Sequence, residues 1–257
     1  FPVDPRRGII SEPFGGLRLT RPSNAASNRV MTGGADIWRA FGTPEWGLLA
    51  LSLAGALFYL ASGERVYRGR ALVKGAAVGV LALLVAWLLA SGMLAGPDVW
   101  LLVTALALST IGDVFLVGES ERHFRAGLVS FLLAHVVYGA IFVGHVEAPW
   151  WPGFGATVAA AGVVLAAAMV LAWLWPVLGS LRGPVAAYVA VIVTMALAAL
   201  LADFDTPWVA LGAVAFVASD AALAANRFRG PLPGAGTFVW SSYCAAQGLL
   251  AFGVLAG

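Results

Sequence analysis

Two aspartates lie toward the ends of long, mostly apolar stretches, where a carboxyl group is costly to bury. These are Asp113 and Asp220. An ionisable side chain at the centre of a membrane span costs about 2.5–3.5 kcal/mol on insertion scales, so such residues tend to be functional. Two carboxyl groups in one water-poor site are expected to divide their roles, one staying protonated as an acid and the other staying ionised. We take Asp113 and Asp220 as the candidate catalytic pair and leave open which is the acid.

Seven further polar side chains occur at a similar predicted depth in the apolar stretches or at their ends. Each also has a plain structural interpretation, as an interhelical hydrogen bond, an ion pair with an aspartate or a side chain that reaches the membrane interface. The candidates are Lys74, His135, Tyr138, Asn226, Arg227, Tyr243 and Gln247.

The elements that carry these residues are predicted from composition and block length. Of 257 residues, 61% are hydrophobic and 11% are charged, whereas a soluble domain carries roughly 25% charged residues. The apolar blocks approach the length of about twenty residues that a helix needs to cross a bilayer, and they lack the alternation of a membrane barrel. The expected fold is an all-α bundle of eight transmembrane helices at 46–61, 72–93, 99–117, 124–146, 153–174, 184–201, 207–225 and 238–256.

Charged loop residues predict the orientation of this bundle. Nine basic residues, from Arg65 to Arg229, lie in or beside alternate connections, while the connections on the other side contain none outside the N-terminal tail. Basic loops stay in the cytoplasm. We therefore expect both termini outside and the polar cluster in the cytoplasmic half of a bacterial inner membrane. The net charge of +2 and the scattered basic residues do not indicate nucleic-acid binding, and a single cysteine, Cys244, excludes an internal disulfide.

The first 45 residues differ from the rest in being rich in Pro, Gly, Arg, Ser and Asn, without helical periodicity. We expect residues 1–45 to be a disordered tail and residues 46–256 to form the transmembrane domain. Met31 is a candidate start, which would make residues 1–30 an extension that is not native.

A short internal match relates the two aspartates. Gly112-Asp113 resembles Ser219-Asp220, at an offset of 107 residues, and each pair is followed by an arginine-bearing loop and then by a span with a polar residue, His135 or Tyr243. An offset of four spans would make a parallel four-plus-four repeat, with both aspartates at the same depth.

These motifs resemble those of the YhhN-like family of lysoplasmalogenase-type membrane proteins. The first signature covers 109–116 and the second 211–220, each with the downstream residues that complete it: Phe124, Gly127, Phe131, His135 and Tyr138 for the first, and Phe228, Tyr243 and Gln247 for the second. The resemblance spans residues 46–256. One departure is Lys74-Gly75, where the family has Lys-Pro.

The resemblance implies an eight-span enzyme that cleaves the vinyl ether of lysoplasmalogens, giving a fatty aldehyde and a glycerophospho-alcohol. On this hypothesis Lys74, Asn226 and Arg227 lie where a phosphate head group would bind, and the other candidates orient the acids or the water. No cofactor or metal is required, and the partners are a lipid substrate and the bilayer, with the oligomeric state open. The alternatives are a metal-dependent lipid amidase or esterase, with Asp113, Asp220 and His135 as ligands, and a proton-coupled transporter of lipids or small molecules.

Overall fold

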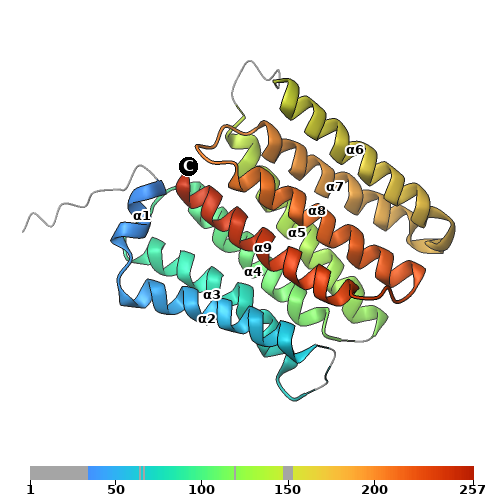
Figure 1. Cartoon of the computed structure of the whole chain (residues 1–257), viewed down its shortest axis with the longest axis horizontal. Helices are drawn as coiled ribbons and strands as arrows, with labels where there is room; N and C mark the ends of the chain where they lie inside the picture. Colours follow the sequence, from blue (N-terminus) through green and yellow to red (C-terminus); the bar gives the residue numbers. More distant parts are fainter. Residues whose placement is uncertain (1–33, 64, 66, 119, 147–152) are drawn as a thin grey trace, which may run out of the picture.

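The computed structural model describes residues 34–63, 65, 67–118, 120–146 and 153–257. Over these ranges the chain is helical and contains no strand (Figure 1). The helices, in chain order, are α1 (Gly34–Ala40), α2 (Thr43–Ser62), α3 (Arg70–Ala90), α4 (Pro97–Phe115), α5 (Glu121–Gly144), α6 (Phe154–Leu174), the short 3₁₀ turns η1 (Trp175–Val177) and η2 (Gly179–Leu181), α7 (Arg182–Leu201), α8 (Trp208–Arg229) and α9 (Ala235–Ala256).

Eight of these helices, α2 to α9, are long and apolar enough to cross a membrane. At about 1.5 Å per residue, helices of 19 to 24 residues span the roughly 30 Å of hydrocarbon in a bilayer. The eight predicted spans are confirmed to within a few residues; the segment expected at 72–93, for example, is α3 (Arg70–Ala90). The protein is a multi-pass membrane protein.

Local chemistry explains several helix ends. Pro44 and Pro97 lie in the first turns of α2 and α4, where the missing N–H costs no hydrogen bond. The Ser120 hydroxyl accepts a hydrogen bond from the His123 N–H at 3.2 Å and so caps α5. Gly230 ends α8 with a φ of 110°, a left-handed value that favours glycine.

The segment before α2 differs from the expectation of a disordered tail where the structure describes it. Residues 1–33, including Met31, lie outside the described residues. Residues 34–40 form α1, in which Ile37 is 1% exposed. The Trp38 ring packs edge-on against Phe252 of α9 at 4.8 Å between centroids. The packing of these apolar side chains stabilises α1. The polar composition of the surrounding sequence showed no helical pattern from which α1 could be predicted.

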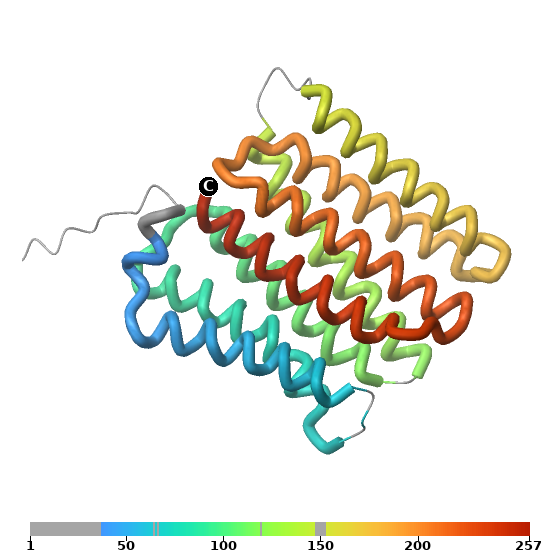
Figure 2. The backbone as a smooth tube through the Cα atoms, viewed as in Figure 1, coloured from blue at the N-terminus to red at the C-terminus, as the bar shows by residue number. Residues whose placement is uncertain are grey.

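Most helices adjacent in the chain pack side by side and antiparallel, whereas α5 and α6 each pack against α7. The most extensive contacts join α8 to α9, α4 to α5, α3 to α4 and α2 to α3. Helices α2 and α6 lie at opposite edges of the bundle, and α9 crosses near α4 in its middle (Figure 1). The backbone trace in Figure 2 shows the end of α9 returning beside α1, in agreement with the contacts between them.

Apolar side chains cover both the interior and the outer surface of the bundle. Leu84, Leu102 and Leu250 are fully buried, whereas Leu72, Phe154 and Met169 are more than two-thirds exposed. Contiguous exposed apolar surface of this kind is what a protein presents to lipid. The glutamate in the first turn of α2 is an exception inside this surface: Glu45 accepts hydrogen bonds from the Gly42 N–H at 2.8 Å and from the Trp87 indole at 2.7 Å.

Candidate active site

The alternating directions of the helices bring the candidate polar residues to one end of the bundle. Asp113 and Asp220 lie in the C-terminal halves of α4 and α8, which run toward this end. Lys74 and Tyr243 lie in the N-terminal halves of α3 and α9, which run away from it. The connections at this end carry the basic residues. These four residues therefore lie toward the same end of the bundle.

Close helix packing sets the position of the first aspartate. A side chain on Gly112 would come within 2.6 Å of the Phe131 ring, so α4 approaches α5 at this residue. The Ser130 hydroxyl of α5 donates to the Leu108 carbonyl of α4 at 2.7 Å. Because neighbouring residues on a helix point about 100° apart, this contact with α5 turns Asp113 toward α9.

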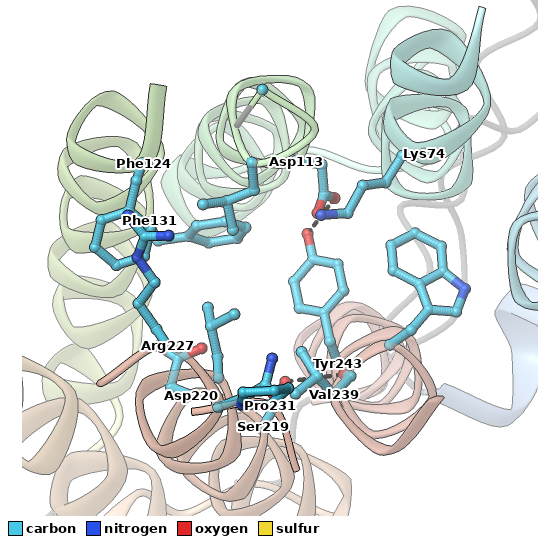
Figure 3. Close-up of a pocket in the computed structure, with 15 residues that line it drawn as sticks. Lys74, Asp113, Phe124, Phe131, Ser219, Asp220, Arg227, Pro231, Val239 and Tyr243 are labelled. Atoms are coloured by element: carbon cyan, nitrogen blue, oxygen red, sulfur yellow. Dashed lines mark hydrogen bonds and ion pairs between the residues drawn. The ribbon is translucent and has the colours of Figure 1, made fainter. Parts of the chain in front are cut away.

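Both aspartates line one cavity of about 330 Å³. Figure 3 shows Asp113 with Lys74 and Tyr243 on one side of it and Asp220 with Arg227 on the other. Its wall also includes Gly118 and Pro231, which belong to the connections after α4 and α8. The cavity thus extends from the carboxyl groups to the basic end of the bundle.

Asp113 is buried and has a cationic partner. Its side chain is 2% exposed and accepts a hydrogen bond from the Tyr243 hydroxyl at 2.6 Å. The Lys74 ammonium lies 3.7 Å from the other carboxylate oxygen. The same ammonium lies 5.9 Å from the ring centres of Tyr59 and Trp240, a cation–π arrangement that holds it beside the cavity. These contacts favour the ionised carboxylate at Asp113.

Asp220 has a tyrosine and a histidine as its nearest polar partners and is more accessible. Its side chain is 14% exposed and accepts a hydrogen bond from the Tyr188 hydroxyl at 2.5 Å. The His135 Nε2 lies 3.8 Å from the same oxygen, beyond hydrogen-bond distance. Among the described residues, no Lys or Arg forms an ion pair with Asp220. A carboxyl group that lacks a cation in an apolar site is stabilised in its neutral form.

In the predicted repeat, each aspartate has a contact with a residue from the other half of the chain. Tyr243 follows Asp220 in the sequence but donates to Asp113. His135 follows Asp113 but lies beside Asp220. Asp113 therefore accepts a hydrogen bond from the other half of the chain, whereas Asp220 accepts one from Tyr188 of its own half and has His135 of the other half at 3.8 Å.

The remaining predicted residues divide into two groups. Asn226 and Arg227 line the cavity with Lys74 and Tyr243. Asn226 Oδ1 accepts from the Leu232 N–H at 2.8 Å, and the Arg227 guanidinium lies 4.7 Å from the centre of the Phe124 ring. His135, Tyr138 and Gln247 are buried but do not line the cavity, and the Tyr138 hydroxyl donates to the Gln247 side chain at 2.6 Å.

The alternative of a metal site has no ligand cluster to support it in the described ranges. No three His, Cys, Asp or Glu side chains gather there in a way that would hold an ion. Of the set considered from the sequence, Asp113 and Asp220 each accept a hydrogen bond from a tyrosine, and His135 lies 3.8 Å from Asp220.

Comparison with known proteins places most of the chain in one family. The model of the YhhN family matches residues 69–254, which is more than half of the chain and includes every candidate site residue. The chain belongs to the YhhN family. The match begins just before α3 and ends within α9, so α1 and α2 precede it.

Several curated relatives of this YhhN protein carry the name lysoplasmalogenase. The chain is 38% identical to that of Mycobacterium tuberculosis over 160 residues, which are 61% of this chain and 60% of the relative. It is 34% identical to the human lysoplasmalogenase TMEM86A over 179 residues, 64% of this chain and 70% of the relative. The chain thus spans about 60% of the length of the mycobacterial relatives it matches. No solved structure matches it.

One residue of this YhhN-family site escaped the sequence analysis. The Tyr188 hydroxyl donates to Asp220, and Tyr188 lies toward the end of the bundle that carries the basic connections. Span order alone would have given its depth, since the helix that carries it starts at Arg182. It was missed because a tyrosine in an apolar block is ordinarily a packing residue.

Proposed function

We propose that this protein is an intramembrane hydrolase that cleaves the vinyl ether bond of lysoplasmalogen-like, single-chain ether phospholipids. The products are a fatty aldehyde and a glycerophospho-alcohol. The observation that carries the proposal is the pair of unlike carboxyl groups on one cavity, Asp113 beside an ammonium and Asp220 beside neutral groups. The lysoplasmalogenase names of its relatives support the choice of substrate.

Asp220 acts as the acid that starts the reaction. Its carboxyl proton moves to the β-carbon of the vinyl ether, so the double bond is consumed and an oxocarbenium ion forms across the α-carbon and the ether oxygen. The Tyr188 hydroxyl, which donates to one carboxyl oxygen, stabilises the negative charge that Asp220 acquires. The ionised Asp113 stabilises the cation, as a carboxylate does in glycoside hydrolysis.

Asp113 acts as the base in the second half of the reaction. Water adds to the α-carbon and gives its proton to Asp113, which produces a hemiacetal. In the collapse of the hemiacetal, Asp113 returns this proton to the departing glycerol oxygen and Asp220 accepts the hemiacetal hydroxyl proton. The carbon–oxygen bond breaks, the aldehyde forms, and both carboxyl groups regain their starting states.

The basic residues at the mouth of the cavity bind the phosphate of the substrate. Arg227 lines the cavity near its end, and Lys74 lies deeper beside Asp113. Since Asn226 Oδ1 is already occupied by the Leu232 N–H, its NH₂ group is the donor that remains for a ligand. With basic connections in the cytoplasm, the cavity faces the cytoplasmic leaflet of a bacterial inner membrane and both termini lie outside.

The reaction is tested by supplying purified protein with a lysoplasmalogen in D₂O and analysing the aldehyde. Protonation of the β-carbon places one deuterium on carbon two of the aldehyde, and we expect that label in the product. The matched control lipid carries the same chain as an ester, and we expect no release of fatty acid from it. Turnover of the ester, or an aldehyde without deuterium at carbon two, would exclude this mechanism and favour an esterase or a different ether cleavage.

A further inference from the structure

A second cavity, of about 450 Å³, lies between α5, α6, α7 and α8. Its wall is almost entirely hydrocarbon: among the described residues that line it, the side chains with polar atoms are Tyr188 and Asp220. Much of the α6 side consists of small residues, including Ala159, Gly162 and Ala166. Gly162 faces open space, because a side chain built there would meet no atom within 4 Å.

The apolar cavity and the polar cavity have wall residues in common at the candidate acid. Phe124, Asp220 and Leu223 line both cavities. Asp220 thus has polar space toward Lys74 and Asp113 and hydrocarbon-lined space toward α6. A molecule that placed its reacting bond at Asp220 would have one part in each cavity.

The shape of the apolar cavity is that of a lengthwise groove open to the membrane. On α8 its lining runs from Val214 to Phe228, a rise on the order of 20 Å at about 1.5 Å per residue. Ala159 and Gly162 are exposed on the outer helix α6. Small residues on membrane helices usually permit close contact between backbones, but here they leave space that a lipid chain can enter from the side.

We infer that this groove, formed by α5, α6, α7 and α8, binds the alkenyl chain of the substrate and so sets the preferred chain length. The inference rests on the proposed function: the head group occupies the polar cavity, the vinyl ether lies at Asp220, and the chain extends past Tyr188 toward Ala159. Because both the lining and the chain are hydrocarbon, binding is proportional to the apolar area covered and grows with each methylene. An ordinary bilayer lipid that merely rests against α6 has no such link to the acid.

The first test compares two lysoplasmalogens with the same head group, one with a hexadecenyl and one with a hexenyl chain. In Gly162→Phe, the new ring fills the groove part-way along its length. We expect kcat/KM for the long chain to fall by about tenfold or more, while that for the short chain changes by less than about twofold. Gly155→Phe is the matched control, since Gly155 is also on α6 with open space around it but does not line the groove.

Ala159→Phe gives a graded second variant. Ala159 lies further from Asp220 than Gly162 along the groove, so only the longest chains should lose kcat/KM. Equal losses for long and short chains, or equal effects of Gly155→Phe and Gly162→Phe, would overturn the inference while leaving the hydrolase in place.

A binding measurement separates the groove from the reaction. The probe is a non-hydrolysable alkyl-ether lysophospholipid with a photoreactive diazirine at the end of its chain. We expect it to label peptides of α6 and α8 in the wild type and in Gly155→Phe, and to lose this label in Gly162→Phe. Labelling spread evenly over the lipid-facing helices would contradict the groove. Groove labelling without turnover of any lysoplasmalogen would instead contradict the proposed function alone.

Discussion

The two carboxyl groups of the site differ in the charges and donors around them. Asp113 has an ammonium at 3.7 Å and a tyrosine hydroxyl at 2.6 Å, whereas Asp220 has a tyrosine hydroxyl at 2.5 Å and no ion pair with a Lys or Arg of the described ranges. A hydrogen bond to a charged group is worth about 1.5–3 kcal/mol, so these partners suffice to separate the roles of otherwise identical side chains. In the proposed mechanism, the division of labour between acid and base is therefore set by the neighbours.

The Tyr188 hydroxyl is expected to act on the chemical step, because it donates to Asp220 as that group becomes charged. We predict that Tyr188→Phe lowers kcat by about tenfold to a hundredfold with little change in KM. Steady-state aldehyde release measures both constants. Tyr138→Phe is the matched control: its hydroxyl donates to Gln247 and not to an aspartate, so it should lower stability and leave kcat within about threefold. Equal kcat values for the two variants would contradict this role.

Among the described helices, α8 and α9 make the most extensive contact, and they carry Asp220 and Tyr243. A side chain on Gly253 of α9 would come within 2.8 Å of the Val209 backbone nitrogen of α8. Backbone atoms cannot rotate away as a flexible side chain can. The short distance between α8 and α9 at this point therefore requires a glycine at position 253.

This contact predicts different outcomes for two glycine substitutions on the same helix. Gly253→Ala should lower the free energy of unfolding by about 1–3 kcal/mol because it forces α8 and α9 apart. Gly248→Ala, where the nearest atom would lie at 3.9 Å, should leave it unchanged or raise it by up to about 1 kcal/mol through helix propensity. Thermal unfolding in detergent compares them. A lower melting temperature for Gly248→Ala than for Gly253→Ala would refute the packing argument.

The helices were predicted well because the length of an apolar block and the turn residues that bound it can be read directly from the sequence. The segment expected at 238–256 is α9 (Ala235–Ala256). For the site, counting gave the depth of Lys74, Asp113, Asp220 and Tyr243, all of which line the cavity. Depth does not give the rotation of a helix about its axis.

Helix rotation accounts for what the sequence did not predict. His135 and Gln247 are buried but do not line the cavity. Tyr188 was overlooked although it contacts Asp220. The contact of Tyr243 with Asp113 depends on how α9 is rotated toward α4, and that of His135 with Asp220 on how α5 is rotated toward α8. Spacing along the chain does not determine either rotation.

At the scale of the whole molecule, the basic connections predict how the bundle lies in the membrane. We predict that these connections are cytoplasmic. In a background with Cys244→Ala, a membrane-impermeant maleimide added to intact spheroplasts should label Asp205→Cys, at the opposite end of the bundle, and should not label Ser120→Cys. Both positions are exposed. After permeabilisation both should react, and the reverse pattern in intact cells would mean that the cavity opens outward.

The most direct test of the joint action of Asp113 and Asp220 is the rate of aldehyde release from a lysoplasmalogen by the wild type, the two single Asp→Asn variants and the double variant. If both carboxyl groups act in the same cycle, each single variant loses at least about a hundredfold in kcat, and the double variant is hardly slower than either single one. Asp203→Asn, an exposed carboxylate outside the cavity, should match the wild type. Undiminished release by Asp113→Asn or Asp220→Asn, with the protein folded, would contradict a shared reaction centre.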